Sequence, residues 1–395
     1  MRSDRPQRTN SPAADPAQPA FVRPASAKLA RPAESIALLD GGAHAYPRML
    51  LAIEEAKQSI HLETYAFTAS GVGARFIEAL TAASKRGVVV RVRMDGWGSV
   101  RDGSVVAAKL RRGGCEAEIY NRARSLLLGR LGRNHRKILL VDDEVAFLGG
   151  INIGDENLDA KPRLGWADLA LEIRGPQCQS LGQLIRHERH RQVQSSLRIY
   201  LCGLGGGWKL RRRYIKAFRT ARHSVDIAHG YFMPDRAVMH AIIAARQRGV
   251  EVRILLPGRS DVPFAVVATR SLYSRLLAVG VEIREWNDSV LHAKVATVDG
   301  RKLLVGSFNL DPLSLANEET LVEVSDPHIA EQGEKWIRDH FDRARPMTST
   351  EANARIKRWL FDPMGRAAFR VTAALSQFIA PAKKRRAARS YIFSR

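Results

Sequence analysis

The sequence is poor in cysteine and in long apolar runs. Its three cysteines, Cys115, Cys178 and Cys202, stand far apart, so their spacing indicates neither a metal site nor a disulfide framework and is typical of a reducing compartment. We expect each to be a small buried apolar residue. No run of about 18 apolar residues occurs, which argues against a membrane-spanning helix. Residues 1–33 lack the apolar core of a secretory signal.

Acidic residues are also few. The chain has 63 Lys and Arg against 40 Asp and Glu, a formal net charge of +23. Much of the excess lies at the ends, because residues 1–33 hold six Lys or Arg and two Asp, and residues 364–395 hold eight and no acid. Such an excess predicts an anionic partner, either nucleic acid or an acidic lipid surface.

The two ends also differ in composition from the middle of the chain. Residues 1–33 are rich in Pro, Ala, Ser and Arg without periodicity, and we interpret them as a disordered tail. Residues 346–395 include an apolar helical pattern at 365–379 and a basic run at 383–386. This combination favours an amphipathic, basic segment on the membrane surface; a nucleic-acid-binding tail is the alternative.

The most informative feature is a pattern that occurs twice. In both copies Lys follows His by two positions, Asp by seven, Gly by fourteen and Asn by seventeen. The first copy is His135, Lys137, Asp142, Gly149 and Asn152, and the second is His292, Lys294, Asp299, Gly306 and Asn309. The segment after His292 is predicted to be a strand, so that His292 and Lys294 point the same way. An imidazole beside an ammonium group suits a phosphate, since one can attack or pass a proton and the other neutralises charge.

The repeat extends over most of the chain. The segment 58–67 matches 223–232, 88–99 matches 250–261, and Asp168 stands before one strand as Glu319 stands before its counterpart. Alternating strand and helix patterns predict an α/β fold with a mostly parallel sheet in each half and helices on both faces. Helices are expected at 43–58, 71–86, 105–112, 180–191, 209–222, 235–248, 265–279 and 330–343. The chain is long enough for two domains, which we place at 34–195 and 196–345.

These motifs resemble the phospholipase D superfamily. The fuller text HRKILLVDDEVAFLGGINIG and HAKVATVDGRKLLVGSFNLDPLSLANEE is similar to bacterial cardiolipin synthases of that superfamily, and the resemblance runs from about Ser35 to about Arg345. It implies two similar domains that pack about a pseudo-twofold axis. Both His-Lys pairs would then line one active site between the domains.

The resemblance also implies a two-step transfer through a phosphohistidine. One histidine attacks phosphorus, while the other protonates the leaving glycerol oxygen and later deprotonates the incoming hydroxyl. The matched halves leave the nucleophile open, with His135 favoured. No metal or other cofactor is expected. The phosphate oxygens would be held by Lys137, Lys294, Asn152 and Asn309, with Gly150 and Ser307 in the same supporting group.

Four acidic residues are further candidates. Asp168 and Glu319 are predicted to orient the histidines, because a carboxylate on one ring nitrogen fixes the tautomer and stabilises the charged form; an ordinary acid at a strand end is the alternative. Asp142 and Asp299 are counted with the catalytic motif. Their place at hairpin turns favours a structural role, tying the turn or supporting a lysine, over proton transfer.

Two other segments bear on the site. The loop 121–134 mixes four arginines with Leu126–Leu128 and Leu131, which predicts either a short amphipathic helix on the core or a rim that enters a lipid headgroup layer. The aromatic strand ends 65–67 and 229–232 are expected to reach the site, with Phe67 and Phe232 in the core. His229 has no counterpart in the first half and is left unassigned.

The resulting hypothesis is a cardiolipin synthase-type phosphatidyltransferase that acts on phosphatidylglycerol. We expect it to be a peripheral protein on the cytoplasmic side of the cell membrane, with an anionic phospholipid surface as its partner and no obligate protein partner. The alternatives are a phospholipase D-type hydrolase and a metal-independent nuclease. The sequence shows no stacking array or nucleic-acid module, which argues against nucleic acid. Intact motifs argue against a scaffold without activity.

Overall fold

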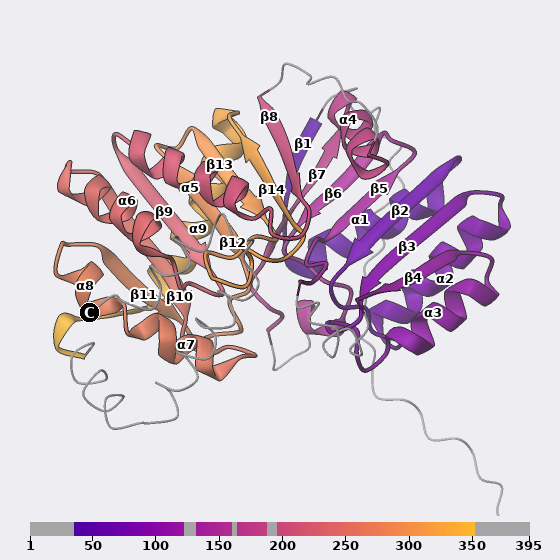
Figure 1. Cartoon of the computed structure of the whole chain (residues 1–395), viewed down its shortest axis with the longest axis horizontal. Coiled ribbons are helices and arrows are strands. Elements are labelled where there is room, and N and C mark those ends of the chain that lie inside the picture. Colours follow the sequence, from indigo (N-terminus) through magenta and orange to yellow (C-terminus); the bar gives the residue numbers. More distant parts are fainter. Residues whose placement is uncertain (1–34, 122–131, 160–163, 188–195, 352–395) are drawn as a thin grey trace, which may run out of the picture.

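The computed structural model describes residues 35–121, 132–159, 164–187 and 196–351 (Figure 1). The predicted tail at 1–33 lies outside the described residues, as do most of the loop 121–134 and all of the predicted membrane-surface segment beyond residue 351. In the part of the chain that is described, no helix has the length and apolar character needed to cross a membrane.

The first half builds one sheet, with the strand order β1-β7-β6-β5-β2-β3-β4. Its elements are β1 (Ser35–Asp40), α1 (Gly41–Glu55), β2 (Ser59–Thr64), α2 (Val72–Lys85), β3 (Val89–Asp95), α3 (Gly103–Arg112), β4 (Glu116–Tyr120), β5 (Ile138–Val141), β6 (Val145–Gly149), the 3-10 turn η2 (Asp155–Asn157), β7 (Leu169–Arg174) and α4 (Pro176–Ile185).

The second half repeats this arrangement, with the strand order β15-β11-β10-β9-β12-β13-β14-β8. Its elements are β8 (Leu197–Cys202), α5 (Trp208–Thr220), β9 (Ser224–His229), α6 (Arg236–Gln247), β10 (Glu251–Pro257), α7 (Pro263–Arg270), α8 (Tyr273–Leu277), β11 (Glu282–Trp286), β12 (Lys294–Val298), β13 (Lys302–Gly306), β14 (Glu319–Val324), α9 (Pro327–Arg343) and β15 (Arg345–Pro346). Apart from the added β15, the two orders agree strand for strand, so the α/β fold and its internal repeat are confirmed.

The expectation of mostly parallel sheets is wrong. The pairs β2–β3 and β3–β4 are parallel, as are β9–β10 and β10–β11, but the other neighbouring strands run antiparallel. The reason is the hairpin within each motif, since a short turn between consecutive strands reverses the chain and permits only antiparallel pairing. The parallel part is confined to the strands that helices connect.

Three element predictions also need correction. The strand β8 was not expected; it pairs antiparallel with β14 at the sheet edge, as β1 pairs with β7. The helix expected at 265–279 is two helices, α7 and α8, and the hydroxyl of Ser271 between them donates to the carbonyl of Ala268 at 2.6 Å, a local bond that competes with helix continuation. The helix expected at 180–191 starts earlier, with Pro176 in its first turn.

The two halves share one of the three apolar cores. One cluster lies within each half, and a third joins them through residues such as Leu140 and Leu148 from the first sheet and Val305 and Val322 from the second. Burial of apolar surface stabilises by about 25 cal/mol per Å², so this shared core holds the halves side by side (Figure 1). The three cysteines are buried and unpaired, as predicted, and Phe67 and Phe232 lie in the cores.

Candidate active site

A cavity of about 570 Å³ is lined by both halves. Its lining includes His135 and Asn152 from the first motif and His292 and Asn309 from the second. The two motifs are far apart in the sequence, and the packing of the sheets brings them to one place. The cavity wall also includes Tyr65, Ala66, Gly98, Arg133, Glu156, Trp166, Tyr231, Met233, Asp261, Val262, Ala265, Asp311, Leu313, Ser314, Ala316 and Asn317.

Each histidine is anchored to the opposite half through its backbone. The amide of His135 donates to the carbonyl of Glu318 at 2.9 Å, and the amide of His292 donates to that of Ala167 at 2.9 Å. His292 stands two residues before β12, so the strand predicted for the segment after His292 is confirmed. The bonds between the halves therefore fix the position of both rings.

Each histidine ring also meets a carboxylate from the opposite half. Nδ1 of His135 lies 3.0 Å from Oε2 of Glu319, and Nδ1 of His292 lies 2.6 Å from Oδ2 of Asp168. Because Nδ1 is engaged in both rings, Nε2 is the nitrogen left for a ligand. The two matched carboxylates found in the sequence thus reach the histidines, with the partners exchanged between the halves.

Burial sets the charge state of these pairs. Desolvation lowers the pKa of His135, and the carboxylate of Glu319 opposes that effect. Desolvation and then the charge of Lys294 lower the pKa of His292 well below its usual value. Desolvation raises the pKa of Asp168 to about 6, although Lys294 opposes it. At neutral pH burial therefore favours neutral imidazoles, the form that can act as a nucleophile.

The motif lysines lie behind the cavity wall and not among its lining residues. Nζ of Lys137 donates to the carbonyl of His135 at 2.8 Å, and Lys294 donates to the carbonyl of His292. Burial and then the charge of Lys294 lower the pKa of Lys137 to about 7. Each ammonium group therefore supports the backbone of its own histidine and adds positive potential behind the cavity.

The motif aspartates lie at hairpin turns, outside the cavity lining. Asp142 accepts from the backbone amides of Lys57, Gln58 and Ser59, each at 2.8 Å. Asp299 does the same for the amides of residues 222–224. Both residues have positive φ angles, 53° and 56°, in the turn. This geometry supports a structural role, tying the hairpin to the start of the neighbouring strand, and not proton transfer.

Gly150 and Ser307, expected near the phosphate, instead contact the carboxylates. A Cβ on Gly150 would lie 2.2 Å from Oδ1 of Asp168. The absence of a side chain at Gly150 therefore makes space for this carboxylate. At the matched position Ser307 donates to Glu319 through its hydroxyl. Neither residue lines the cavity. Their assignment to the phosphate is corrected to support of the carboxylates.

Aromatic side chains surround the histidines; the strand ends that carry Tyr65 and Tyr231 reach the cavity as expected, whereas Trp166 was not assigned from the sequence. Tyr65 packs edge-on against His135 with ring centroids 5.0 Å apart, and Trp166 and Tyr231 pack on His292 at 5.1 and 6.1 Å. The aromatic strand ends were the available signal for the two tyrosines. Asp261 and Asp311 also line the cavity; they have no matched acid in the first half, so a search for repeats could not find them.

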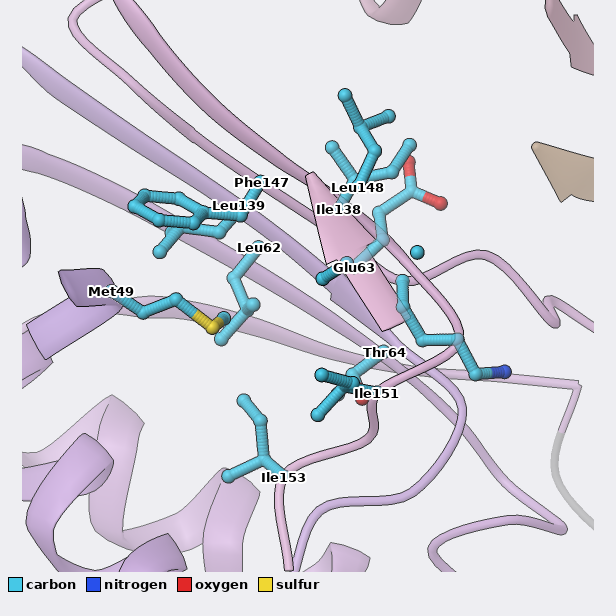
Figure 2. Close-up of a pocket in the computed structure, with 13 residues that line it drawn as sticks. Met49, Leu62, Glu63, Thr64, Ile138, Leu139, Phe147, Leu148, Ile151 and Ile153 are labelled. Atoms are coloured by element: carbon cyan, nitrogen blue, oxygen red, sulfur yellow. The ribbon is translucent and has the colours of Figure 1, made fainter. Parts of the chain in front are cut away.

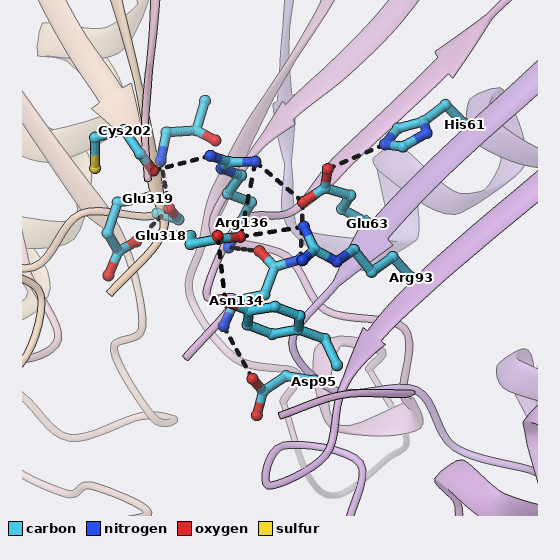
Figure 3. A network of polar contacts seen from close by, with 12 residues as sticks. His61, Glu63, Arg93, Asp95, Asn134, Arg136, Cys202, Glu318 and Glu319 are labelled. Carbon is cyan, nitrogen blue, oxygen red and sulfur yellow. Dashed lines mark hydrogen bonds and ion pairs between the residues drawn. The ribbon is translucent and has the colours of Figure 1, made fainter. Parts of the chain in front are cut away.

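A polar network holds the loop that carries His135 (Figure 3). The amide of Asn134 donates to Asp95 at 2.9 Å and its side chain donates to Glu63 at 2.8 Å. Arg136 lies 3.5 Å from Glu63 and donates to the carbonyl of Cys202 at 2.9 Å. Burial raises the pKa of Glu63, but the hydrogen bond from His61 and the charge of Arg136 outweigh it and hold the pKa at about 2. This carboxylate therefore remains charged and keeps the loop in place.

Comparison with known proteins gives concordant matches. The family model described as "Cardiolipin synthase, PLD-like domain" matches residues 49–167 and 214–341. Cardiolipin synthase B of Escherichia coli K12 is 32% identical over 324 residues, which cover 76% of this chain and 78% of that protein. Cardiolipin synthase of Alkalihalophilus pseudofirmus is 31% identical over 297 residues, covering 69% of this chain and 59% of the relative.

Among solved structures, the phosphatidylserine synthase of Haemophilus influenzae matches with a TM-score of 0.68 and 15% identity, covering 84% of this chain and 94% of that one. The polyphosphate kinase of Porphyromonas gingivalis matches with a TM-score of 0.55 and 16% identity, covering 84% of this chain and 53% of the other. At these identities the likeness establishes the fold. The two segments matched by the family model correspond to the two halves described above.

Proposed function

This chain belongs to the cardiolipin synthase family of phospholipase D-like enzymes, and we propose that it makes cardiolipin and glycerol from two molecules of phosphatidylglycerol. The observation that carries the proposal is the pair of buried histidines on one cavity, each joined at Nδ1 to a carboxylate of the opposite half. Two such groups are what a double displacement at phosphorus requires, one to attack and one to move protons.

In the first step Nε2 of His135 attacks the phosphorus of one phosphatidylglycerol. The bond between phosphorus and the glycerol oxygen breaks, and His292 gives a proton to that oxygen. The anionic phosphate favours the charged imidazolium that this step needs, countering the burial that lowers the pKa of His292. Asp168 stabilises the same charge from the other ring nitrogen.

In the second step a hydroxyl of the second phosphatidylglycerol gives its proton to His292 and attacks the phosphohistidine. The bond between phosphorus and Nε2 of His135 breaks, and cardiolipin leaves. Asn152 and Asn309 line the cavity beside the histidines, and the NH2 group of each side chain is a hydrogen-bond donor. Their amides suit the phosphate oxygens on which negative charge accumulates. Water in place of the second lipid would give phosphatidic acid.

The membrane surface is the natural place for this reaction. The net charge of +23 favours an anionic lipid surface, and we propose a peripheral attachment on the cytoplasmic side. The segments most suited to the attachment, the loop before His135 and the chain beyond residue 351, lie outside the described residues.

Product analysis tests the function directly. The purified protein is incubated with phosphatidylglycerol vesicles without divalent metal, beside His135→Ala, His292→Ala and, as a matched control, the exposed His240→Ala on α6. We expect cardiolipin and glycerol from the wild type and from His240→Ala and none from the other two. Phosphatidic acid as the sole product would replace the synthase with a hydrolase, and no lipid turnover would overturn the lipid function altogether.

A further inference from the structure

The cavity carries an unexpected number of acids for an anionic substrate. Asp261, Asp311 and Glu156 all line it, and Arg133 is the arginine among the lining residues. Carboxylates repel a phosphodiester, so these acids are expected to contact a part of the substrate other than the phosphate. Two of the three, Asp261 and Asp311, come from the second half.

Asp261 is fixed beside His292. The hydroxyl of Tyr231 donates to both oxygens of Asp261, at 2.6 and 2.7 Å, and the Tyr231 ring packs edge-on against that of His292. The carboxylate is therefore held on the wall next to one catalytic histidine. The hydroxyl of Ser260 also donates to Asp261, at 3.1 Å, and both donors are neutral groups that leave the carboxylate its negative charge.

Asp311 is the second acid of this wall. It is 6% exposed and accepts from the backbone amide of Ser314 at 2.7 Å. Among the described residues, neither Asp311 nor Asp261 forms an ion pair with Lys, Arg or His. A buried carboxylate without a cation is costly unless hydrogen-bond donors reach it. Asp261, in contrast, is exposed, and both acids line the cavity in which a ligand would bind.

The first half has no such wall. The positions matched to Asp261 and Asp311 are Ser99 and Gly154. On that side Arg133 stacks over the ring of Trp97 at 4.0 Å from its centroid and also lines the cavity. The two sides of the cavity thus differ in charge: the first half contributes Arg133 together with Glu156, and the second half contributes two acids and no Lys or Arg to the described lining.

We propose that Asp261 and Asp311, with Tyr231, form a subsite for the alcohol headgroup bonded to the reacting phosphate. The subsite accepts hydrogen bonds from groups at the free end of a short headgroup, either the hydroxyls of glycerol or the ammonium of ethanolamine. This inference rests on the proposed function and deepens it, since it places the leaving alcohol beside His292. That placement makes His292 the group that protonates the leaving oxygen and leaves His135 to attack.

The test compares donor lipids that share a phosphatidyl group and differ in the headgroup. Vesicles contain phosphatidylglycerol, phosphatidylethanolamine or phosphatidylpropanol, the last without a donor group at its free end. Excess methanol serves as the common acceptor, and the initial rate of phosphatidylmethanol formation is measured. The variants are Asp261→Asn and Asp311→Asn, with the exposed Asp339→Asn on α9 as a matched control.

A hydrogen bond to a charged group is worth about 1.5–3 kcal/mol, or roughly 10- to 100-fold. We therefore expect the ratio of the phosphatidylglycerol or phosphatidylethanolamine rate to the phosphatidylpropanol rate to fall at least about 10-fold in each variant. The headgroup whose rate ratio falls further is the one that the two acids bind. An unchanged ratio would overturn the subsite. Turnover by the wild type would still support the proposed enzyme activity. An equal loss with all three donors would also overturn it, as a structural effect. No turnover of any donor by the wild type would overturn the proposed function and the subsite together.

Discussion

The surroundings of the two motif lysines differ, although the backbones around them repeat. In the first half a small cavity of about 20 Å³ lies beside Lys137, bordered by Met49, Thr64 and Ile151 (Figure 2). In the second half the matched positions are Tyr214, His229 and Phe308. The Tyr214 ring meets the rings of His229 and Phe308 at centroid distances of 5.7 and 6.1 Å, so aromatic rings occupy the space that the cavity has in the other half.

This difference gives the lysines different electrostatic settings. A cavity of that volume has room for one water molecule next to Lys137. Lys294 instead has the buried ring of His229 on the neighbouring strand, at the paired position, and neither ring nitrogen has a partner in the described part of the chain. Burial and the charge of Lys294 lower the pKa of His229 to about 3, so the ring is neutral. The two halves therefore share the lysine and differ in the residues packed around it.

A second contrast concerns one face of each sheet. Arg136 of the first half pairs with Glu63, and Arg93 and Arg136 pair with Glu318 of the second half, whereas the residues at the matched positions, Ala228, Leu255, Ala293 and Ala167, belong to the shared apolar core. The helix α9, with 17 residues, packs across β9 to β13, while α4, with 10, packs on β7 and β8. In the second half α9 therefore covers the strands that carry Ala228 and Leu255, whereas in the first half α4 packs on β7 and β8 and the matched Glu63 and Arg93 lie on β2 and β3.

The largest effect should come from removing one histidine at a time, which tests whether the halves differ in chemistry. General acid–base groups contribute about 10²–10⁴-fold, and we expect both alanine variants to lose at least 10³-fold in rate. In His292→Ala the attack by His135 still occurs with a good leaving group such as p-nitrophenol, so a phosphatidyl adduct on the protein should accumulate in intact mass spectra. His135→Ala should show none. An adduct found only in His135→Ala would mean that His292 is the nucleophile and His135 the general acid.

The orienting carboxylates should give the next largest effect. Asp168→Asn and Glu319→Gln remove the charge opposite each imidazolium, and we expect about a 10²-fold loss or more in kcat. Asp168 also has a stability signature, because its folded pKa of about 6 lies above the usual value of 3.8. A raised carboxyl pKa means that the folded state holds the proton more tightly, so this group lowers stability as the pH rises from about 4 to about 6.

Thermal melts of the wild type and Asp168→Asn at pH 4.5 and pH 7 measure that signature. The variant should gain stability relative to the wild type at pH 7 and gain less at pH 4.5. A difference that does not change with pH would show that Asp168 titrates normally.

The charged face offers a test with a smaller effect, read as stability. Arg136→Ala leaves Glu63 buried without its arginine, which we expect to cost about 3 kcal/mol. The fourfold change Glu63→Ala, Arg93→Leu, Arg136→Ala and Glu318→Ala installs at each site the residue of the matched position in the opposite half. It removes every charge of the group, and we expect it to lower the free energy of unfolding by less than Arg136→Ala alone does. Urea unfolding provides the measurement, and a fourfold variant less stable than Arg136→Ala would contradict the comparison of the two faces.

Exchanging the residues beside the lysines should have the smallest effect. Thr64→His forces an imidazole into a cavity of about 20 Å³, and overpacking of this kind costs about 1–3 kcal/mol. His229→Thr creates a cavity but removes an imidazole without partners, so the two contributions oppose each other and we expect a change below about 1 kcal/mol. Equal urea midpoints for the two variants would show that the packing on the two sides is equivalent.

The sequence allowed the repeat, and with it most of the site, to be predicted. Matched spacing located both histidines, and matched strand ends located Asp168 and Glu319. It could not show that each carboxylate serves the opposite half, because that depends on how the sheets pack. Asp261 and Asp311 were missed since the search favoured residues present in both halves. Gly150 and Ser307 were misplaced because a motif gives neighbours along the chain and not the direction in which a side chain points.

The partners at each histidine are separated by long stretches of chain, 184 residues for His135 and Glu319 and 124 for Asp168 and His292. Contacts of such long range form late in folding, since loop closure must precede them. During synthesis from the N-terminus the whole first sheet can fold while Glu319 has not yet been made. A nascent or truncated chain would therefore hold its first histidine without an orienting carboxylate. The exchange of carboxylates delays the assembly of the active site until the second half has folded onto the first.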